Sequence, residues 1–180
     1  MSYRNVLVIL ILLSAAAWWF LHEDPEAEVR NAHQELTRLL SKTEGEASST
    51  MIFNARVLQS MFADTCEVTG DAEMLGGSYT PEEMVSTIIR VQGIFLSIDL
   101  TFHELEIEFP AADDAIVNFT AVLVGRSKME GEEEAAETRE VISRMRKVEG
   151  KWLFAEFRLR LPPRAGAQIE TEYATIAEYM

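Results

Sequence analysis

The chain has 180 residues, of which 48% are hydrophobic and 26% are charged, which is enough for one domain with an ordinary core and an additional segment. Thirty acidic residues (Asp+Glu 30) against sixteen basic ones (Lys+Arg 16) give a formal net charge of -14 at pH 7. That charge excludes nucleic acid and anionic lipid headgroups as expected partners, because both are themselves negatively charged. The single cysteine, Cys66, excludes an internal disulfide and a cysteine-based metal cluster, and we expect a buried thiol.

An uninterrupted apolar segment, residues 6–21, starts at Val6 and ends at Leu21. As a helix it would be about 24 Å long, somewhat shorter than the hydrocarbon core of a bilayer at about 30 Å. Trp18 and Trp19 lie near its end, where aromatic side chains favour the headgroup zone. Arg4 precedes the segment and several acidic residues follow it, so the positive-inside rule keeps the N-terminus in the cytoplasm. We therefore expect residues 1–22 to anchor the protein in a membrane, with the globular part extracytoplasmic, and periplasmic in a bacterium.

A cleaved signal peptide is the alternative for this segment. Residues 6–13 have the length of a signal-peptide core, and the alanines at 15–17 offer a small-residue cleavage site. Cleavage would release a secreted protein. The small positive charge before the segment, and the tryptophan pair that would begin the mature chain, favour the anchor.

The residues after the segment predict three helices. The first begins at Asp24 and Pro25, which suit a helix cap and a first helical position, and runs to about Leu40. The second runs from about residue 50 to 63. The third begins with a capping box at residues 80–83 and ends near Gly93. The apolar face expected for the second helix consists of Phe53, Val57, Leu58, Met61 and Phe62.

After Gly93 the apolar spacing changes to a period of two, which indicates strands. Within residues 98–109 the alternation switches parity, which predicts a bulge near His103 and Glu104. Further strands are expected over residues 117–123, 138–148 and 151–161, the last two joined by a tight turn at Glu149 and Gly150. A short strand with turns is expected over 66–77, a solvated acidic loop over 127–136 and a polar tail over 162–180. The order predicts one α+β domain over residues 23–161, with three N-terminal helices packed in a strongly curved antiparallel sheet.

Three stretches resemble a known family. Residues 61–68 (MFADTCEV) resemble the end of a second helix running into a first strand, residues 79–83 (YTPEE) the entry to a third helix, and residues 146–152 (RKVEGKW) a final hairpin. In this order they resemble the nuclear transport factor 2-like superfamily, which includes the SnoaL-like proteins and ketosteroid isomerase. The resemblance covers about residues 25–161. It implies a cone-like fold with a pocket between the curved sheet and the helices.

The isomerase branch of that superfamily implies three catalytic positions. The carboxylate base that follows the first strand matches Gly70 here, with Asp71 one residue later. The protonated acid on the third long strand, which donates to an oxyanion, matches Ser143. The tyrosine of the first helix has no counterpart between residues 29 and 42. These departures argue against the isomerase reaction.

Histidines are the other catalytic candidates. A histidine–aspartate dyad of the dehydratase kind would pair His33, beside the apolar stripe of the first helix, with Asp64 or Asp71. The alternative is a structural histidine whose ring bonds a backbone carbonyl. His103, at the expected bulge, is an edge histidine in water on the simpler interpretation. The spacing of histidine, cysteine and acidic residues matches no metal or cofactor motif, so we expect neither metal nor cofactor.

Basic residues gather on the last two expected strands, interleaved with glutamates. Trp152, Arg158 and Arg160 share one parity, which places them together on the outer face of the sheet. Cross-strand ion pairs would explain the charges. The alternative is an interface, because proteins of this fold commonly form homodimers through the open face of the sheet, and tryptophan and arginine suit interfaces.

Two hypotheses for function follow. The first is a membrane-tethered, non-catalytic domain that binds an envelope protein partner or a small apolar ligand. The second is a small-molecule isomerase, hydratase or cyclase of the SnoaL-like kind. An enzyme needs polar groups that converge in the pocket, whereas a binding protein would show an apolar or filled one.

Overall fold

The computed structural model describes residues 24–45, 48–70, 76–128 and 134–160. The expected anchor, residues 1–22, lies outside them, as do Asp71, residues 129–133 of the acidic loop and the tail over 162–180. Among the described helices, none has the length and apolar character needed to cross a bilayer. The described part is an α+β domain, as expected, with three helices and a six-stranded sheet.

The helices begin where their capping residues predict. In α2 (Pro25–Leu40), the Asp24 side chain accepts a hydrogen bond from the backbone amide of Glu26 at 3.0 Å. Before α4 (Pro81–Ile94), Thr80 and Glu83 form the complete capping box. Between them lies α3 (Ser48–Gln59). It ends earlier than expected, because Phe62 already belongs to the first strand.

The sheet contains β1 (Phe62–Gly70), β2 (Gly77–Tyr79), β3 (Phe95–Ala111), β4 (Asp114–Ser127), β5 (Ala135–Val148) and β6 (Lys151–Arg160). Their order in the sheet is β2-β1-β6-β5-β4-β3. All neighbours pair antiparallel except β1 and β6, which run parallel. The expected antiparallel sheet is therefore wrong at that pair. No hairpin joins β1 to β6, so no turn imposes opposite directions on them.

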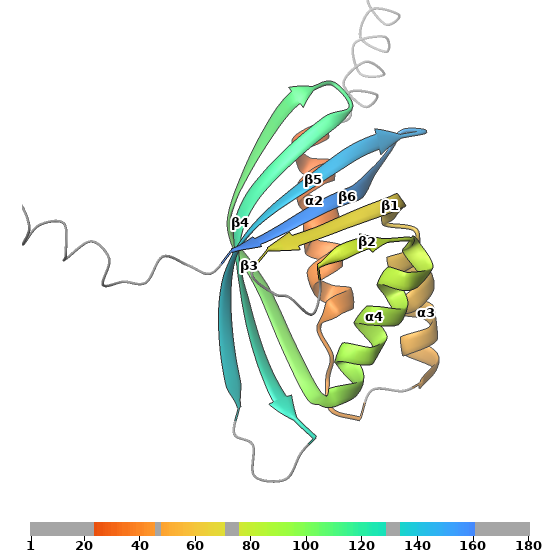
Figure 1. Ribbon diagram of the computed structural model, residues 1–180, viewed down its shortest axis with the longest axis vertical. Coiled ribbons are helices and arrows are strands. Elements are labelled where there is room, and N and C mark those ends of the chain that lie inside the picture. Colours follow the sequence, from red (N-terminus) through yellow and green to blue (C-terminus); the bar gives the residue numbers. More distant parts are fainter. Residues whose placement is uncertain (1–23, 46–47, 71–75, 129–133, 161–180) are drawn as a thin grey trace, which may run out of the picture.

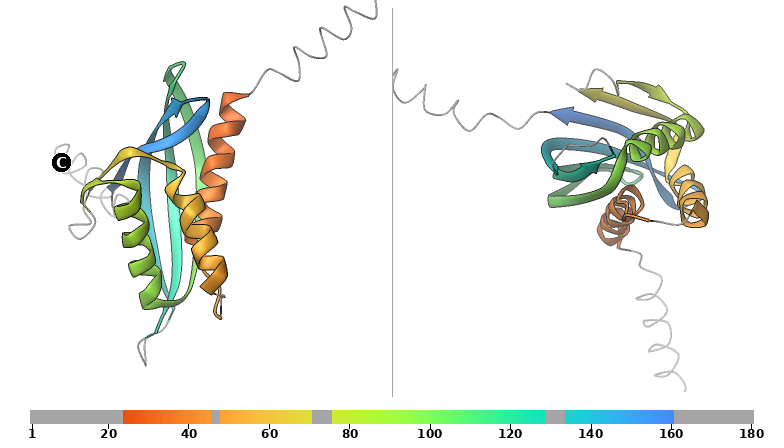
Figure 2. Two further views of the ribbon diagram at one scale, coloured as in Figure 1. Left: turned by 90° about the vertical axis from the view of Figure 1, so that its right-hand side faces the viewer. Right: turned by 90° about the horizontal axis from the view of Figure 1, so that it is seen from below.

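The sheet is strongly curved, and all three helices lie on its concave side (Figure 1; Figure 2). The long helix α2 crosses the sheet, and α3 and α4 lie side by side near β1 and β2 (Figure 1). The core fills the space between the helices and the sheet, where Val29, Leu36 and Leu39 of α2 meet Val117 and Phe154 of the strands. None of the three described helices covers the convex face of the sheet.

Two bulges decide which side chains face the helices. In β3 the register shifts between His103 and Glu106, and Glu104 has a φ of 57°, which confirms the predicted bulge. In β6, Glu156 pairs with Arg144 and Phe154 with Met145, so Ala155 is an extra residue without a partner. The alternation of inward and outward side chains along β6 therefore reverses at Ala155. Even-numbered residues before the bulge face the same side of the sheet as odd-numbered residues after it.

Because of the bulge in β6, the expected placement of Trp152 on the outer face of the sheet is wrong. This side chain was expected on the outer face with Arg158 and Arg160, but it is only 8% exposed. Its indole Nε1 donates to a carboxylate oxygen of Glu28 at 2.9 Å, so it packs against the start of α2. Arg158 and Arg160 lie on the other side of the bulge and are exposed.

The expected apolar face of α3 is also partly wrong. Phe53 is 63% exposed and Ile52 is 62% exposed. The helix packs on the domain through the side that carries Ala55 and Leu58, of which Leu58 is buried.

Candidate functional site

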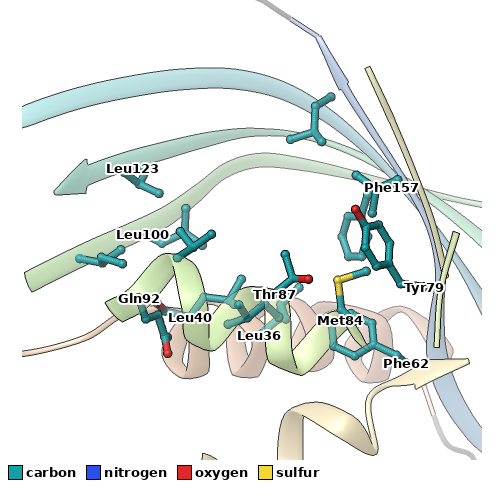
Figure 3. A pocket seen from close by; sticks show the side chains of 15 residues that line it. Leu36, Leu40, Phe62, Tyr79, Met84, Thr87, Gln92, Leu100, Leu123 and Phe157 are labelled. Atoms are coloured by element: carbon teal, nitrogen blue, oxygen red, sulfur yellow. Dashed lines mark hydrogen bonds between the residues drawn. The ribbon is translucent and has the colours of Figure 1, made fainter. Parts of the chain in front are cut away.

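A cavity of about 250 Å³ lies between α4, the second half of α2 and the concave face of the sheet (Figure 3). Its walls come from elements far apart in the sequence. The apolar side chains that define it include Leu36, Phe62, Met84, Ile88, Leu100 and Phe157. The pocket implied by the family resemblance is therefore present.

The spacing of residues along each helix explains why most of these side chains face the cavity. Leu36 and Leu40 lie one turn apart on α2, and Met84 and Ile88 lie one turn apart on α4, so each pair shares a helix face. The bulge at Ala155 turns Phe157 into the cavity although Phe154 also faces the helices. No spacing within β6 alone would predict both orientations.

Among the described residues, three polar side chains line the cavity, and no Asp, Glu, His, Lys or Arg does. They are Tyr79 of β2, and Thr87 and Gln92 of α4. The amide nitrogen of Gln92 donates to the carbonyl oxygens of Leu39 at 3.2 Å and Leu40 at 3.0 Å, which ties α4 to the end of α2. Because an unpaired charge is costly to bury, these walls favour an uncharged, mainly apolar ligand.

His33 is fully buried in the core, and both of its ring nitrogens have partners. Its Nδ1 lies 2.8 Å from the carbonyl oxygen of Val29, and its Nε2 lies 2.8 Å from the hydroxyl oxygen of Ser143. A carbonyl can only accept, so Nδ1–H donates to Val29 and the Ser143 hydroxyl donates to Nε2. Burial lowers the pKa of His33 from 6.5 to about 4, so the ring is neutral at pH 7.

Aromatic rings contact the imidazole of this pair. The His33 ring makes edge contacts with Phe119 and Phe154, with centroids 5.3 Å and 5.0 Å away, and a wider one with Phe102. Neither His33 nor Ser143 lines the apolar cavity. The pair is a hydrogen-bonded part of the core, which agrees with the structural alternative for His33.

The proposed dyad is not formed with Asp64. That residue is exposed on β1, whereas the His33 ring is buried and already bonded at both nitrogens. Asp71 lies outside the described residues. Sequence reasoning singled out His33 and Ser143 separately and missed that they bond each other, since they lie on different elements.

Gly70, which matches the position of the isomerase base, cannot carry a side chain here. It has a φ of 137°, and a Cβ atom would lie 2.0 Å from the carbonyl oxygen of Leu159. The close approach of β1 to β6 therefore closes this position to a carboxylate.

The remaining candidates lie away from the cavity. His103 is exposed, with Nε2 3.2 Å from the hydroxyl of Thr101. The Cys66 thiol is fully buried, as expected, and burial raises its pKa to about 12. In the described part of the chain, no three metal-ligating side chains gather in one place.

Comparison with known proteins identifies the architecture. No protein-family model matches the sequence, and no curated protein matches it significantly. A scytalone dehydratase-like protein from Novosphingobium aromaticivorans is similar in structure with a TM-score of 0.63 and 16% identity, over 77% of this chain and 84% of that one. Hexachlorocyclohexane dehydrochlorinase LinA-type3 from Novosphingobium barchaimii gives a TM-score of 0.61 and 18% identity, over 78% and 90%.

A third similar structure is a nuclear transport factor 2-like protein with a cystatin-like fold from Novosphingobium aromaticivorans. Its TM-score is 0.59 at 11% identity, and the match covers 93% of this chain and 96% of that one. At these identities the similarity concerns the fold. Together with the helices on the concave side of a curved sheet, it shows that the chain has the nuclear transport factor 2-like, cystatin-like fold.

Proposed function

We propose that this domain binds a small apolar molecule in the cavity between α4 and the sheet, without catalysing a reaction on it. The observation that carries the proposal is the separation of two features. Among the described residues, the cavity has uncharged, mainly apolar walls, whereas the buried His33–Ser143 pair lies outside it, with the His33 ring against Phe119 and Phe154. A proton-transfer enzyme would need such groups in contact with its substrate.

The volume suggests the size of the ligand. An apolar cavity of about 150 Å³ holds a benzene molecule. A cavity of about 250 Å³ therefore suits a molecule of roughly ten non-hydrogen atoms, such as naphthalene. Its affinity would come from the removal of apolar surface from water.

Neighbouring residues of α4 provide a matched test. Ile88 lines the cavity, whereas Ile89 is 39% exposed and does not line it. Naphthalene would be titrated into the full chain by calorimetry, and into the variants Ile88→Trp and Ile89→Trp. We expect at least a roughly tenfold loss of affinity in Ile88→Trp, because the indole fills the cavity. Equal binding by both variants would show that the cavity is not the site.

We also propose that the apolar segment from Val6 to Leu21 holds the domain on the outer side of a membrane. Its hydrophobicity and flanking charges support this. In a bacterial host, alkaline phosphatase fused after Met180 should be active and sediment with the membranes. The mass of the purified chain distinguishes an anchor from a cleaved signal, since cleavage near Ala17 would shorten it. An inactive, cytoplasmic fusion would refute the tether.

An enzyme that moves a proton is the second candidate. It is favoured by two similar structures, a scytalone dehydratase-like protein and a dehydrochlorinase, and by the Tyr79 phenol in the cavity. The ketone 1-tetralone, of similar size to naphthalene, would be incubated with the protein in deuterium oxide. An enzyme would be supported if the hydrogens next to the carbonyl of 1-tetralone exchange for deuterium faster than in buffer. This acceleration should be lost in Asp71→Asn or Tyr79→Phe. Binding without faster exchange would support a binding protein.

A homodimer through the convex face of the sheet remains our proposal for the exposed arginines. Arg158 pairs with Glu156 on that face, and Arg160 follows it on β6. Sedimentation analysis should show a dimer that Arg158→Glu with Arg160→Glu disrupts. Arg56→Glu is the control, because it makes the same kind of charge change on the exposed side of α3, away from the convex face of the sheet. A monomeric wild-type chain would reject this interface.

A further inference from the structure

The cavity contains a hydroxyl group that its own helix does not use. Thr87 is half-buried on α4 and lines the cavity. Threonine hydroxyls inside helices commonly bond the carbonyl one turn earlier. Among the described residues, the Thr87 hydroxyl has no such hydrogen bond and no other one. This hydroxyl can therefore serve a ligand as donor or acceptor.

Figure 3 shows the Thr87 hydroxyl on the side of α4 that faces the cavity, with the Tyr79 ring across the space from it. Gln92 is different, because its amide nitrogen is already committed to Leu39 and Leu40. The three polar side chains of the cavity are thus of uncharged types, and Thr87 lies in the middle of α4. The remaining walls are hydrocarbon and aromatic surface.

We propose that the cavity selects a neutral molecule with an apolar body of roughly ten non-hydrogen atoms and one hydroxyl or carbonyl group, which bonds to Thr87. This inference rests on the proposed function and names its ligand class. A pure hydrocarbon would cover the Thr87 hydroxyl without replacing its hydrogen bonds to water, which costs binding free energy. A carboxylate or an amine would lose its hydration without meeting an opposite charge, which costs more.

Three probes of one shape separate these possibilities: 2-naphthol, naphthalene and 2-naphthoate, titrated into the full chain at neutral pH. We expect 2-naphthol to bind about three- to tenfold more tightly than naphthalene, the contribution of one hydrogen bond. We expect 2-naphthoate to bind at least roughly tenfold more weakly than 2-naphthol. If 2-naphthoate binds more tightly than 2-naphthol, the neutral ligand class is wrong.

Substitutions at Thr87 test the hydrogen bond itself. Thr87→Val keeps the shape but removes the hydroxyl, so the advantage of 2-naphthol should disappear while naphthalene still binds. Thr87→Ser keeps the hydroxyl and should keep the advantage. Ser86→Ala removes an exposed hydroxyl from the adjacent position of α4 and should change none of the three affinities.

Different results would refute the role of Thr87 and the proposed apolar binding site. If 2-naphthol and naphthalene bind equally to the wild-type chain, or if the advantage persists in Thr87→Val, the role of Thr87 is refuted and the apolar site stands. If none of the probes binds, or if Ile88→Trp binds them as the wild type does, the proposed function itself is refuted.

Discussion

The Nε2 atom of His33 lies 2.8 Å from the hydroxyl oxygen of Ser143, and this hydrogen bond joins residues separated by 110 positions in the chain. Both residues are 0% exposed. The bond connects the middle of α2 to β5, one of the two middle strands of the sheet. One turn further along α2, Leu36 forms part of the cavity wall, so the pair helps to hold that wall in place.

Ser143→Ala should destabilise the protein by about 1–3 kcal/mol, because it leaves a buried ring nitrogen of His33 without a donor. Urea unfolding measures the change. In His33→Phe with Ser143→Ala, the loss should be smaller than the sum of the single losses, since the two residues share one interaction. Ser86→Ala on the exposed side of α4 should change stability by less than about 0.5 kcal/mol. A Ser143→Ala variant as stable as the wild type would contradict this account.

The stability of the domain should fall as the pH is lowered from about 6.5 to about 4. Burial lowers the pKa of folded His33 to about 4, while the unfolded chain takes up the proton near 6.5. Between pH 4 and 6.5 the unfolded state therefore binds more protons than the folded state, which favours unfolding. The stabilisation that neutral His33 provides is complete only above pH 6.5. The shift corresponds to roughly 3 kcal/mol.

Unfolding at several pH values, compared with His33→Gln, isolates this contribution. The carboxyls of Glu35 and Asp114 also have lowered pKa values, through Arg38 and Arg144, and they add a loss at low pH in both chains. The difference between the two chains should therefore shrink between pH 6.5 and 4. If it is constant over this range, His33 is not the titrating group.

Glu28→Ala should destabilise the protein by about 1–2 kcal/mol, because the buried indole N–H of Trp152 loses its acceptor. The same carboxylate oxygen accepts from Lys147 at 3.0 Å. Glu28→Gln keeps an acceptor for the indole and should cost less. Glu26→Ala, which removes an exposed pair with Arg30, should cost less than about 0.5 kcal/mol. Chemical denaturation of the three variants checks this order.

Cys66 should be almost unreactive in the folded protein. Burial raises the pKa of its thiol to about 12, and the thiolate is the reactive form. At mildly alkaline pH, a thiol reagent such as dithionitrobenzoate should react about a hundredfold more slowly than in concentrated urea. Asp64→Cys places a thiol at an exposed position of the same strand and should react quickly. Rapid modification of folded wild-type protein would contradict the buried placement.

Glu149→Asn should stabilise the β5–β6 hairpin by about 0.5 kcal/mol, because asparagine tolerates a positive φ better than glutamate does. Glu149 has a φ of 50° and Gly150 one of 78°, as a tight hairpin turn requires. Glu149→Val should be destabilising by comparison. Thermal unfolding of both variants tests the turn, and a stable Glu149→Val would argue against the left-handed conformation.

Local sequence patterns determined much of the fold. The caps at Asp24 and Thr80 and the turn at Glu149 and Gly150 involve residues within four positions of each other, so their signals are complete in the sequence. The bulge near His103 was also predictable, because the apolar parity changes there and only one face of β3 is covered by helices. The buried thiol of Cys66 followed the general behaviour of isolated cysteines.

Only the tertiary structure decided the site. In β6 the four residues from Trp152 to Ala155 are all apolar, so the pattern does not reveal the bulge at Ala155 that turns Trp152 and Phe157 to the same side. The parallel pairing of β1 with β6, which closes Gly70 to any side chain, depends on strands far apart in the chain. The bond between His33 and Ser143, and the position of the Thr87 hydroxyl in the cavity, depend on how α2 and α4 pack on the sheet. Composition and spacing thus determine the elements and their caps, whereas long-range packing determines which polar groups meet each other and which face the cavity.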